Sequence, residues 1–253
     1  MILDTFRLDG NVALVTGASA GLGAAISIAL AEAGADVACH GNHRAPDATC
    51  ETIAGLGRRT VAVSGDLIDP QVPRKLYETS VAELGRIDIL INNAGTIRRA
   101  PAVDYSEEDW QAVMEVNLSS VFRLSQLAGK QMIERGRGKI INIASILSFQ
   151  GGVTVPAYSA SKGGVALLTR ALANEWAAKG VNVNAIAPGY MRTDNTLALQ
   201  HNETRNRQIL ERIPAARWGD PKDVAGAAVF LASSASDFVH GHVLVVDGGW
   251  MGR

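Results

Sequence analysis

The sequence predicts an α/β protein in which helices cover both faces of a parallel β-sheet. Short apolar segments rich in β-branched residues alternate with helical segments along all 253 residues. A glycine-rich turn joins the first apolar segment to the first helical segment, and no linker, charge block or fixed-period repeat interrupts the alternation. Strands buried on both faces form continuous apolar runs, and parallel strands need helical connections. One domain, spanning residues 1–253, is therefore expected.

The first strand is expected at Asn11–Thr16 (NVALVT), a mostly apolar run that is typical of a buried strand. Two long helices are expected at Glu107–Arg135 and Ala157–Lys179, and the pattern leaves open whether they belong to the core or to a subunit interface. Six later segments share the short, apolar character of the first strand: Val37–Cys39, Thr60–Val63, Ile87–Ile91, Lys139–Ile143, Val181–Ile186 and Val243–Val246.

A glycine-rich turn at Gly17–Gly23 (GASAGLG) directly follows the first strand, and a helix is expected at Ala24–Ala33. Strand, glycine turn and helix in this order are typical of a nucleotide site. Gly17 permits a tight turn, Gly21 allows the backbone to approach a pyrophosphate, and Gly23 allows close packing of helix on strand. The free N–H groups of the helix N-terminus favour phosphate. The alternative is an ordinary glycine-rich βα turn.

Composition argues against several classes of function. The net charge of −1 gives no electrostatic reason to expect a nucleic-acid partner. No apolar stretch reaches ~18 residues, so no membrane span is expected. The N-terminus (MILDTFRLDG) contains acids and does not resemble a signal peptide. Cys39 and Cys50 are the only cysteines, which favours a cytoplasmic enzyme over a disulfide-rich secreted protein.

No metal site is expected, because no group of His, Cys and acidic residues has metal-ligand spacing. His40 and His43 are close in sequence but fall at the end of the second strand, where solvated polar residues are common. Both are therefore expected to be solvent-exposed.

Polar or glycine signals follow four successive predicted strands. Asp66 follows the third strand, Asn92–Gly95 (NNAG) the fourth, Ser145 the fifth and Pro188-Gly189 the sixth. Each residue type is also a common turn former. Ligands of open α/β sheets bind beyond the carboxyl ends of the strands. Because the four polar or glycine signals fall at that edge, they predict a ligand site there.

Tyr158 and Lys162 carry the strongest chemical signal. Residues four apart share one face of a helix. A free phenol titrates near ~10, and a nearby ammonium group favours the phenolate and lowers this pKa. Ser145, thirteen residues before Tyr158, could hydrogen-bond the same substrate oxygen. The three residues together predict proton transfer to or from a carbinol.

Taken in order, these motifs resemble those of the short-chain dehydrogenase/reductase family over essentially the whole chain. The resemblance implies a Rossmann fold with seven strands, a nicotinamide cofactor and a substrate loop after the sixth strand, at about 188–215. The motifs that carry it are T-G-x-x-x-G-x-G at Thr16–Gly23, N-N-A-G at Asn92–Gly95, Asn117, Ser145, Tyr158-x-x-x-Lys162 and Pro188-Gly189.

The resemblance implies catalytic roles for four residues. Tyr158 would be the acid/base, Lys162 would lower its pKa and hold the nicotinamide ribose, and Ser145 would polarise the substrate carbonyl. Asn117 would anchor a water that links Lys162 to solvent. The residues implied in cofactor binding are Gly17, Ser19, Gly21, Leu22, Gly23, Asn42, Arg44, Asp66, Leu67, Asn93, Ala94, Gly95, Tyr158, Lys162, Pro188, Gly189 and Thr193.

Three of these residues also have simple structural interpretations. Asn117 could hydrogen-bond a helix backbone, Lys162 could be a solvated lysine, and Asp66 could cap the next helix. Only the complete pattern favours the functional roles.

The choice between NAD and NADP stays open. NAD-binding Rossmann proteins usually carry an acid about 20 residues past the glycines, but the second strand ends in CHGNHR with no acid. Gly41 fills the usual acidic place. His43 or Arg44 could neutralise a 2′-phosphate and so favour NADP, whereas the nearest relatives favour NAD.

The expected substrate is a sugar acid. Arg98 and Arg99 follow the N-N-A-G motif, and arginine pairs well with carboxylates. Ser148 and Gln150 add polar groups near Ser145, as does the lid sequence MRTDNT (191–196). Together with the segments Ala187–Met191, Arg217–Gly219 and Asp247–Trp250, these residues most resemble those of the 2-dehydro-3-deoxy-D-gluconate 5-dehydrogenases within the family, and gluconate 5-dehydrogenases are very similar. The substrate-binding residues implied are Arg98, Arg99, Ser145, Ser148, Gln150 and Tyr158.

Two other functions share the same scaffold. A 3-oxoacyl-carrier-protein reductase has every core motif, but it would need a basic surface for its acidic carrier, and the net charge of −1 does not support one. A non-catalytic nucleotide-binding regulator could dispense with the serine, tyrosine and lysine.

The resemblance also implies a homotetramer.

Overall fold

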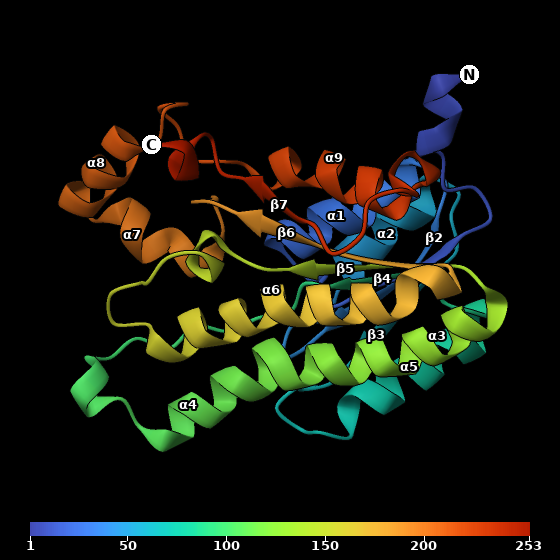
Figure 1. The fold of residues 1–253 in the computed structure, drawn as a ribbon, viewed down its shortest axis with the longest axis horizontal. Coiled ribbons are helices and arrows are strands. Elements are labelled where there is room, and N and C mark those ends of the chain that lie inside the picture. The colour runs from blue at the N-terminus through green and yellow to red at the C-terminus, as the bar shows by residue number, and fades with distance from the viewer.

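The computed structural model describes residues 1–253 and contains one seven-stranded sheet, in the order β3-β2-β1-β4-β5-β6-β7 (Figure 1). All six neighbouring pairs are parallel. The seven predicted strands are confirmed, with their ends shifted by at most two residues. Their bounds are β1 Val12–Val15, β2 Asp36–Gly41, β3 Thr60–Ser64, β4 Ile89–Asn92, β5 Gly138–Ile143, β6 Val181–Pro188 and β7 Val243–Val246.

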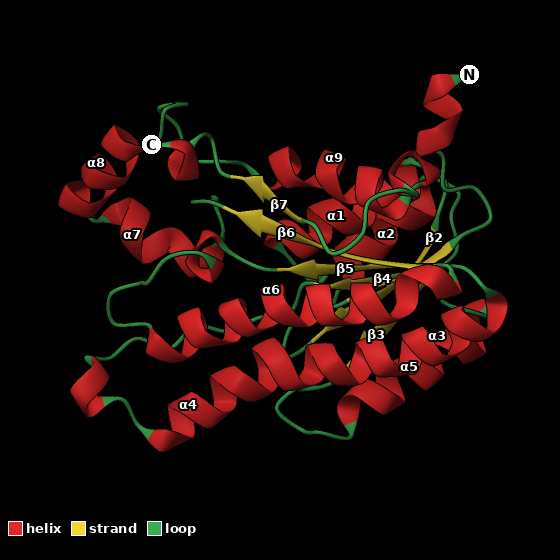
Figure 2. Ribbon diagram, in the orientation of Figure 1, coloured by secondary structure: helices red, strands yellow, loops and turns green.

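Helices cover both faces of the sheet, which confirms the predicted fold class (Figures 1 and 2). One face is covered by α1 (Gly21–Glu32), α2 (Asp47–Gly55) and α9 (Pro221–Ala232). The other face is covered by α3 (Val72–Leu84), α5 (Ser120–Arg135) and α6 (Pro156–Trp176). Each layer encloses its own apolar core, of 21 and 20 buried residues respectively. None of the helices is both long and apolar enough to cross a bilayer.

The predicted helix Glu107–Arg135 consists of three parts. It starts as α4 (Glu107–Met114), widens into a π-helical turn at Glu115–Ser119, and continues as α5. A π turn inserts one extra residue per turn and is frequent at functional sites. Asn117 lies in this turn, so the widening lies at one of the predicted site residues.

A helical segment follows β6 at the carboxyl edge of the sheet. It contains a 3-10 turn at Asp194–Thr196, then α7 (Leu197–His201) and α8 (Glu203–Arg212). In Figure 1 the arrowheads of β5, β6 and β7 point toward α7 and α8. A small apolar cluster lies under this segment and includes Ile209, Trp218 and Trp250. The segment thus lies over the end of the sheet where ligands of parallel α/β proteins bind.

Candidate active site

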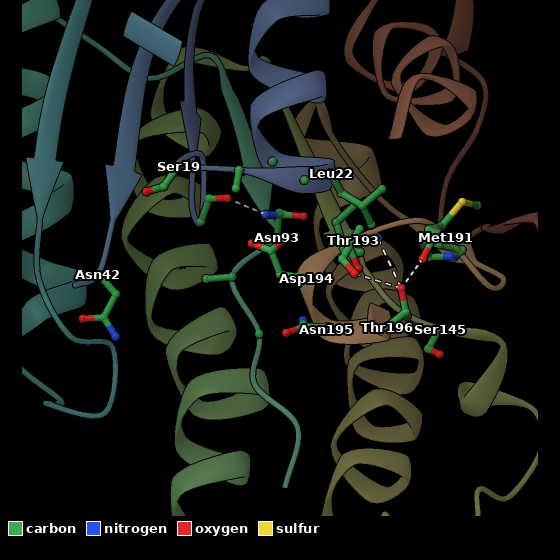
Figure 3. Close-up of a pocket in the computed structure, with 18 of the residues that line it drawn as sticks. Ser19, Leu22, Asn42, Asn93, Ser145, Met191, Thr193, Asp194, Asn195 and Thr196 are labelled. Atoms are coloured by element: carbon green, nitrogen blue, oxygen red, sulfur yellow. Dashed lines mark hydrogen bonds between the residues drawn. The ribbon is translucent and has the colours of Figure 1, made fainter. Parts of the chain in front are cut away.

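A cleft of about 420 Å³ runs along the carboxyl edge of the sheet, at the point where strand order reverses between β1 and β4. It extends from the end of β2 to the middle of the sheet and ends at α6. Figure 3 shows Asn42 at one end and Ser145 at the other. The predicted cofactor residues that line it are Gly17, Ser19, Gly21, Leu22, Gly23, Asn42, Arg44, Asn93, Ala94, Gly95, Tyr158, Lys162, Pro188, Gly189 and Thr193.

The glycine turn between β1 and α1 adopts a backbone that only glycine tolerates well. Gly17 has φ +67° and Gly21 has φ +55°, both in the left-handed region. A Cβ on Gly23 would lie 2.1 Å from the carbonyl oxygen of Gly17. The turn therefore folds tightly over the first residues of α1. It leaves the backbone at Gly21 open to the cleft, as a pyrophosphate site requires.

His40 is buried, with an exposed fraction of 1%, so the expectation that it is solvated was wrong. Its Nδ1 accepts a hydrogen bond from the backbone N–H of Gly17 at 3.3 Å, and its Nε2 lies 2.9 Å from the carbonyl oxygen of Gly65. This pairing requires a neutral ring with its proton on Nε2. Burial lowers the pKa of His40, in agreement with that state. The side chain braces the glycine turn against β2.

Asn93 and Thr16 hold the other side of the glycine turn. The Asn93 side chain donates to the carbonyl oxygens of Thr16 at 2.8 Å and Gly17 at 3.2 Å. In return the Thr16 hydroxyl accepts from the backbone N–H groups of Asn93 and Ala94, each at 2.9 Å. The neighbouring Asn92 points into the core, where it donates to Asn142 at 2.8 Å. The two asparagines therefore serve different purposes.

The end of the cleft at β2 carries no acidic side chain; Asn42, His43 and Arg44 line it. The Ser19 hydroxyl donates to the carbonyl oxygen of Arg44 at 2.5 Å and closes the loop. A Cβ on Gly41 would lie 2.3 Å from that same carbonyl oxygen and 2.5 Å from Ser19 Oγ. The loop geometry therefore has no room for an acid at position 41.

Asp66 and Leu67 do not line the cleft. The Asp66 carboxylate lies 3.9 Å from His43 Nε2 and accepts a hydrogen bond from the backbone N–H of Ile68. The Leu67 side chain is buried in the core with an exposed fraction of 3%. Their predicted contacts with an adenine ring stay predictions.

Tyr158 and Lys162 lie one turn apart on α6, beside Ser145 at the end of β5. Lys162 is buried, and its Nζ lies 5.8 Å from the centre of the Tyr158 ring and donates to the carbonyl oxygen of Ile143 at 2.6 Å. The Ser145 hydroxyl oxygen accepts from the backbone N–H of Leu147 at 3.1 Å. The hydroxyl hydrogen of Ser145 can therefore be donated to the Tyr158 oxygen or to an oxygen of a bound ligand.

Ser148 ties the loop after β5 to α6. Its hydroxyl donates to the backbone carbonyl of Lys162 at 2.6 Å and accepts from the backbone N–H of Ser145 at 3.3 Å. With these bonds Ser148 fixes the spacing between the predicted serine and lysine, and it does not line the second cavity, which is described below.

Withdrawal of the Tyr158 hydroxyl from water raises its pKa, and two neighbours oppose this effect. The larger opposing cause is the hydrogen bond with Ser145, followed by the positive charge of Arg99. Burial also lowers the pKa of Lys162 to about 8. The three predicted residues thus share one poorly solvated site in which the ionised forms depend on hydrogen bonds and on nearby charge.

Asn117 is fully buried and bonded on both sides of its amide. Its Oδ1 accepts from the backbone N–H of Thr96 at 2.8 Å. Its Nδ2 donates to the Thr96 carbonyl at 2.9 Å and to Ser161 Oγ at 3.1 Å. The side chain links the π turn to the segment after N-N-A-G and to α6. Both Nδ2 hydrogens are used in this way, so a water could bond Asn117 only at the second lone pair of Oδ1 or at its backbone.

A second cavity of about 770 Å³ adjoins the cleft. Ser145 and Tyr158 line both spaces, so they stand at the junction. Of the predicted substrate residues, Arg99 and Gln150 also line this cavity. Arg98 does not, because its guanidinium turns toward Asp109, with 3.5 Å between Nε and Oδ1.

Helix α8 contributes cavity residues that sequence reasoning missed. Arg205, Gln208, Ile209 and Arg212 all line the cavity. Their spacing of three, four and seven residues places them on one helical face. This polar face within the predicted substrate loop was visible in the sequence, but nothing in the pattern indicated which face would turn toward the site.

The lid residues Met191–Thr196 lie opposite the glycine turn. Figure 3 shows Thr193 on the side of Leu22, and a methyl group of Thr193 would lie 3.4 Å from a Cβ on Gly21. Thr196 Oγ1 donates to the Met191 carbonyl at 2.6 Å, which orders the turn. Asn195 and Thr196 line both cavities. The lid therefore forms a wall shared by the two spaces.

Comparisons with known proteins place this geometry in context. A family model described as enoyl-(acyl carrier protein) reductase matches residues 17–251. The 2-dehydro-3-deoxy-D-gluconate 5-dehydrogenase of Dickeya dadantii (strain 3937) is 53% identical over 254 residues, which is 100% of each chain.

Solved structures extend the comparison. A structure from Agrobacterium tumefaciens with bound NADP, provisionally described as a 2-deoxy-D-gluconate 3-dehydrogenase, is 54% identical, covers 98% of this chain and 99% of that chain, and has a TM-score of 0.92. The gluconate 5-dehydrogenase of Burkholderia cenocepacia J2315 in complex with NADP and tartrate is 39% identical over 100% of each chain, with a TM-score of 0.94.

Proposed function

This chain belongs to the short-chain dehydrogenase/reductase family, and on that premise we propose that it is an NAD(P)-dependent oxidoreductase acting on a six-carbon sugar acid. The proposed reaction interconverts a secondary alcohol and a ketone. The most specific form of the proposal is 2-dehydro-3-deoxy-D-gluconate 5-dehydrogenase activity, by similarity to the relatives that carry this name.

One observation carries the choice of an acidic substrate. The cavity beside Ser145 and Tyr158 is lined by Arg99, Arg205 and Arg212 and by no aspartate or glutamate. The whole chain has a net charge of −1, so this positive charge is local to the cavity. Three positive charges gathered at one cavity favour an anionic ligand. The polar groups of Gln150, Asn195 and Thr196 suit the hydroxyls of a sugar chain.

The chain's own groups suffice for the proton chemistry. A bound nicotinamide dinucleotide supplies or accepts the hydride. During reduction, negative charge grows on the substrate oxygen, and the hydroxyl hydrogens of Ser145 and Tyr158 are placed to bond it. Tyr158 then gives its proton to that oxygen, and in oxidation it takes the proton back. The Ser145 hydroxyl stays neutral throughout and orients the oxygen.

We assign supporting roles to Lys162 and Asn117 within the same proposal. The Lys162 ammonium group would hold the nicotinamide ribose and favour the Tyr158 phenolate. Asn117 would position the segment at Thr96 and the start of α6, because its amide bonds both. The backbone of its π turn would hold the water that supplies protons to Lys162.

The cleft fits a dinucleotide, and its β2 end favours NADP over NAD. His43 and Arg44 are the cationic or titratable groups there, and position 41 has no room for an acid. A 2′-phosphate pairs well with arginine. The similar structures from A. tumefaciens and B. cenocepacia hold NADP.

The proposal is tested by following NADH and NADPH oxidation against a panel of ketones. The panel contains 5-keto-D-gluconate, keto-deoxy acids derived from uronates, a neutral keto sugar and an acetoacetyl thioester. Fast turnover on the sugar acids, with NADPH preferred, is expected. Turnover on the thioester alone would instead assign the protein to acyl-carrier chemistry and overturn the proposal.

We further propose a cytoplasmic homotetramer. Phe122 on α5 and Leu167 on α6 are exposed by 43% and 64%, and such apolar side chains on two long neighbouring helices suit an interface. Both cysteines are free thiols, as expected in a reducing compartment. The molar mass of the protein, measured by light scattering after size-exclusion chromatography, tests the tetramer, and the mass of a monomer would contradict it.

A further inference from the structure

The arginines of this protein divide into two groups by their partners. Most form ion pairs, including two sequence neighbours of cavity residues: Arg98 pairs with Asp109 and Arg207 with Glu211. Seven arginines form no ion pair, and three of these seven, Arg99, Arg205 and Arg212, line the cavity. The other four are Arg44, Arg58, Arg170 and Arg253. What distinguishes the cavity is that three unpaired guanidinium groups gather around it with no carboxylate among its lining residues. This local positive charge suits an anionic group of the substrate.

The three cavity arginines do not lie in equivalent places. Arg99 is close enough to Tyr158 to act on the charge of its hydroxyl, so it stands at the reacting end. Arg205 and Arg212 belong to α8, which forms another wall of the cavity. In the proposed substrate, four carbon–carbon bonds separate the reacting C5 from the carboxylate carbon, a span of roughly 5 Å. The carboxylate must therefore bind away from Tyr158.

Of the two cavity arginines on α8, Arg205 bonds Gln208 within the helix at 2.8 Å, whereas Arg212 contacts residues of other segments. Its guanidinium carbon lies 4.1 Å from the centre of the Trp250 ring, a cation–π stack. One Nη2 hydrogen faces Gln150 Oε1 at 3.5 Å. Trp250 is itself buried and lies 4.7 Å, centre to centre, from Tyr190. Gln150 and Trp250, both distant from α8 in the sequence, therefore contact the same planar guanidinium group.

We propose that Arg212, stacked on Trp250 and flanked by Gln150, binds the carboxylate of the sugar-acid substrate, while Arg99 serves the reacting end. Stacking engages only the face of the guanidinium group, so its N–H edge stays free for a two-pronged bond to a carboxylate. Arg205, two turns earlier on the same helical face, adds positive charge to that wall. This inference rests on the proposed function and names the residue that recognises its substrate class.

The test compares Arg212→Gln with Arg207→Gln, a matched control. Both changes remove one positive charge from α8, but Arg207 lies outside the cavity and pairs with Glu211 at the surface. Steady-state kinetics would use 5-keto-D-gluconate and the neutral 5-keto-D-fructose. Arg212→Gln is expected to raise KM for the acid roughly 10- to 100-fold, with KM for the neutral sugar and kcat changed less than about threefold. Arg207→Gln should change neither KM.

If Arg212→Gln raised KM equally for the acid and for the neutral sugar, the assignment would be overturned. It would also be overturned if Arg212→Gln and Arg207→Gln changed KM for the acid equally. Arg212→Lys guards against misfolding, because it keeps the charge and loses only the two-pronged geometry. An intermediate KM for the acid is expected from it. A KM equal to that of the unaltered protein would contradict the two-pronged bond.

A failure of the proposed function can be told apart from a failure of this inference. If the unaltered protein reduces no keto acid, the function is wrong. Carboxylate binding is then measured by calorimetry with tartrate and the NADPH-saturated protein. Weaker tartrate binding in Arg212→Gln than in Arg207→Gln would support the site, and equal or absent binding in all three proteins would overturn it.

Discussion

The ammonium group of Lys162 on α6 donates a 2.6 Å hydrogen bond to the carbonyl oxygen of Ile143, the last residue of β5. Ser145 follows two residues later, so this bond joins the two elements that carry the predicted catalytic groups. The lysine is almost fully buried. Its position is therefore well fixed, but its charge is poorly solvated, and burial lowers its pKa from 10.5 to about 8.

The kcat/KM for ketone reduction should decrease above pH 8, where Lys162 loses its proton. The folded pKa lies below the unfolded one, so the unfolded chain binds more protons between pH 8 and 10.5. Folding stability from this group therefore increases with pH across that window, so deprotonation of Lys162 does not by itself unfold the protein. Lys162→Met should lower kcat/KM at least ~100-fold, and its pH profile should no longer show a decrease near pH 8. Activity that stays constant to pH 10 would contradict the assignment.

Tyr158→Phe should abolish turnover while cofactor binding persists, because only the hydroxyl proton donor is removed. A loss of ~10³-fold or more in kcat is expected from removal of the acid/base group. NADPH binding, measured by fluorescence, should change less than about threefold. Retention of most activity would exclude Tyr158 as the acid/base.

Arg99→Ala should move the titration of Tyr158 to higher pH, because the positive charge that lowers its pKa is lost. In the oxidation direction, which needs the phenolate, the rising limb of kcat/KM should shift upward. Arg98→Ala is the matched control, since Arg98 pairs with Asp109 away from the cavity. Identical pH profiles for Arg99→Ala and Arg98→Ala would show that the charge of Arg99 does not act on Tyr158.

Gly41→Asp should weaken the binding of NADH and NADPH alike. A Cβ at this position meets the Arg44 carbonyl at 2.3 Å, so the loop must move before any new carboxylate can reach a ribose. Asn42→Asp, which fits without this clash, should weaken NADPH roughly 10-fold and affect NADH little. A clean switch to NADH in Gly41→Asp would show that the loop adjusts at little cost.

The free energy of unfolding should depend on pH because His40 is buried. Its folded pKa lies below the ordinary value of 6.5, so the unfolded chain takes up the proton first as pH falls. Stability should therefore decrease below about pH 6.5. His40→Gln should lessen that dependence and weaken cofactor binding, because the ring braces Gly17.

Much of the fold and part of the site could be predicted from local pattern. A strand buried on both faces must be apolar throughout, so seven apolar runs were enough to locate the seven strands. The glycine turn was equally readable, because the positive φ values of Gly17 and Gly21 are available to few other residues. The spacing of Tyr158 and Lys162 is fixed by the helical repeat.

Other features depend on contacts between distant segments and so have no local signature. Asn92 and Asn93 are identical neighbours, yet one bonds Asn142 in the core and the other braces the glycine turn. His40 looked like a solvated residue at a strand end until Gly17 and Gly65 were brought to its two ring nitrogens.

The sequence by itself determined the strands, the glycine turn and the spacing of the catalytic helix, because each follows from backbone geometry and periodic burial over a few residues. Only the tertiary structure decided that Arg99 faces the cavity and Arg98 does not, and that Arg212 stacks on Trp250. An exposed charge takes its direction from partners supplied by other elements. Asp109, Gln150 and Trp250 become partners only when the chain is folded.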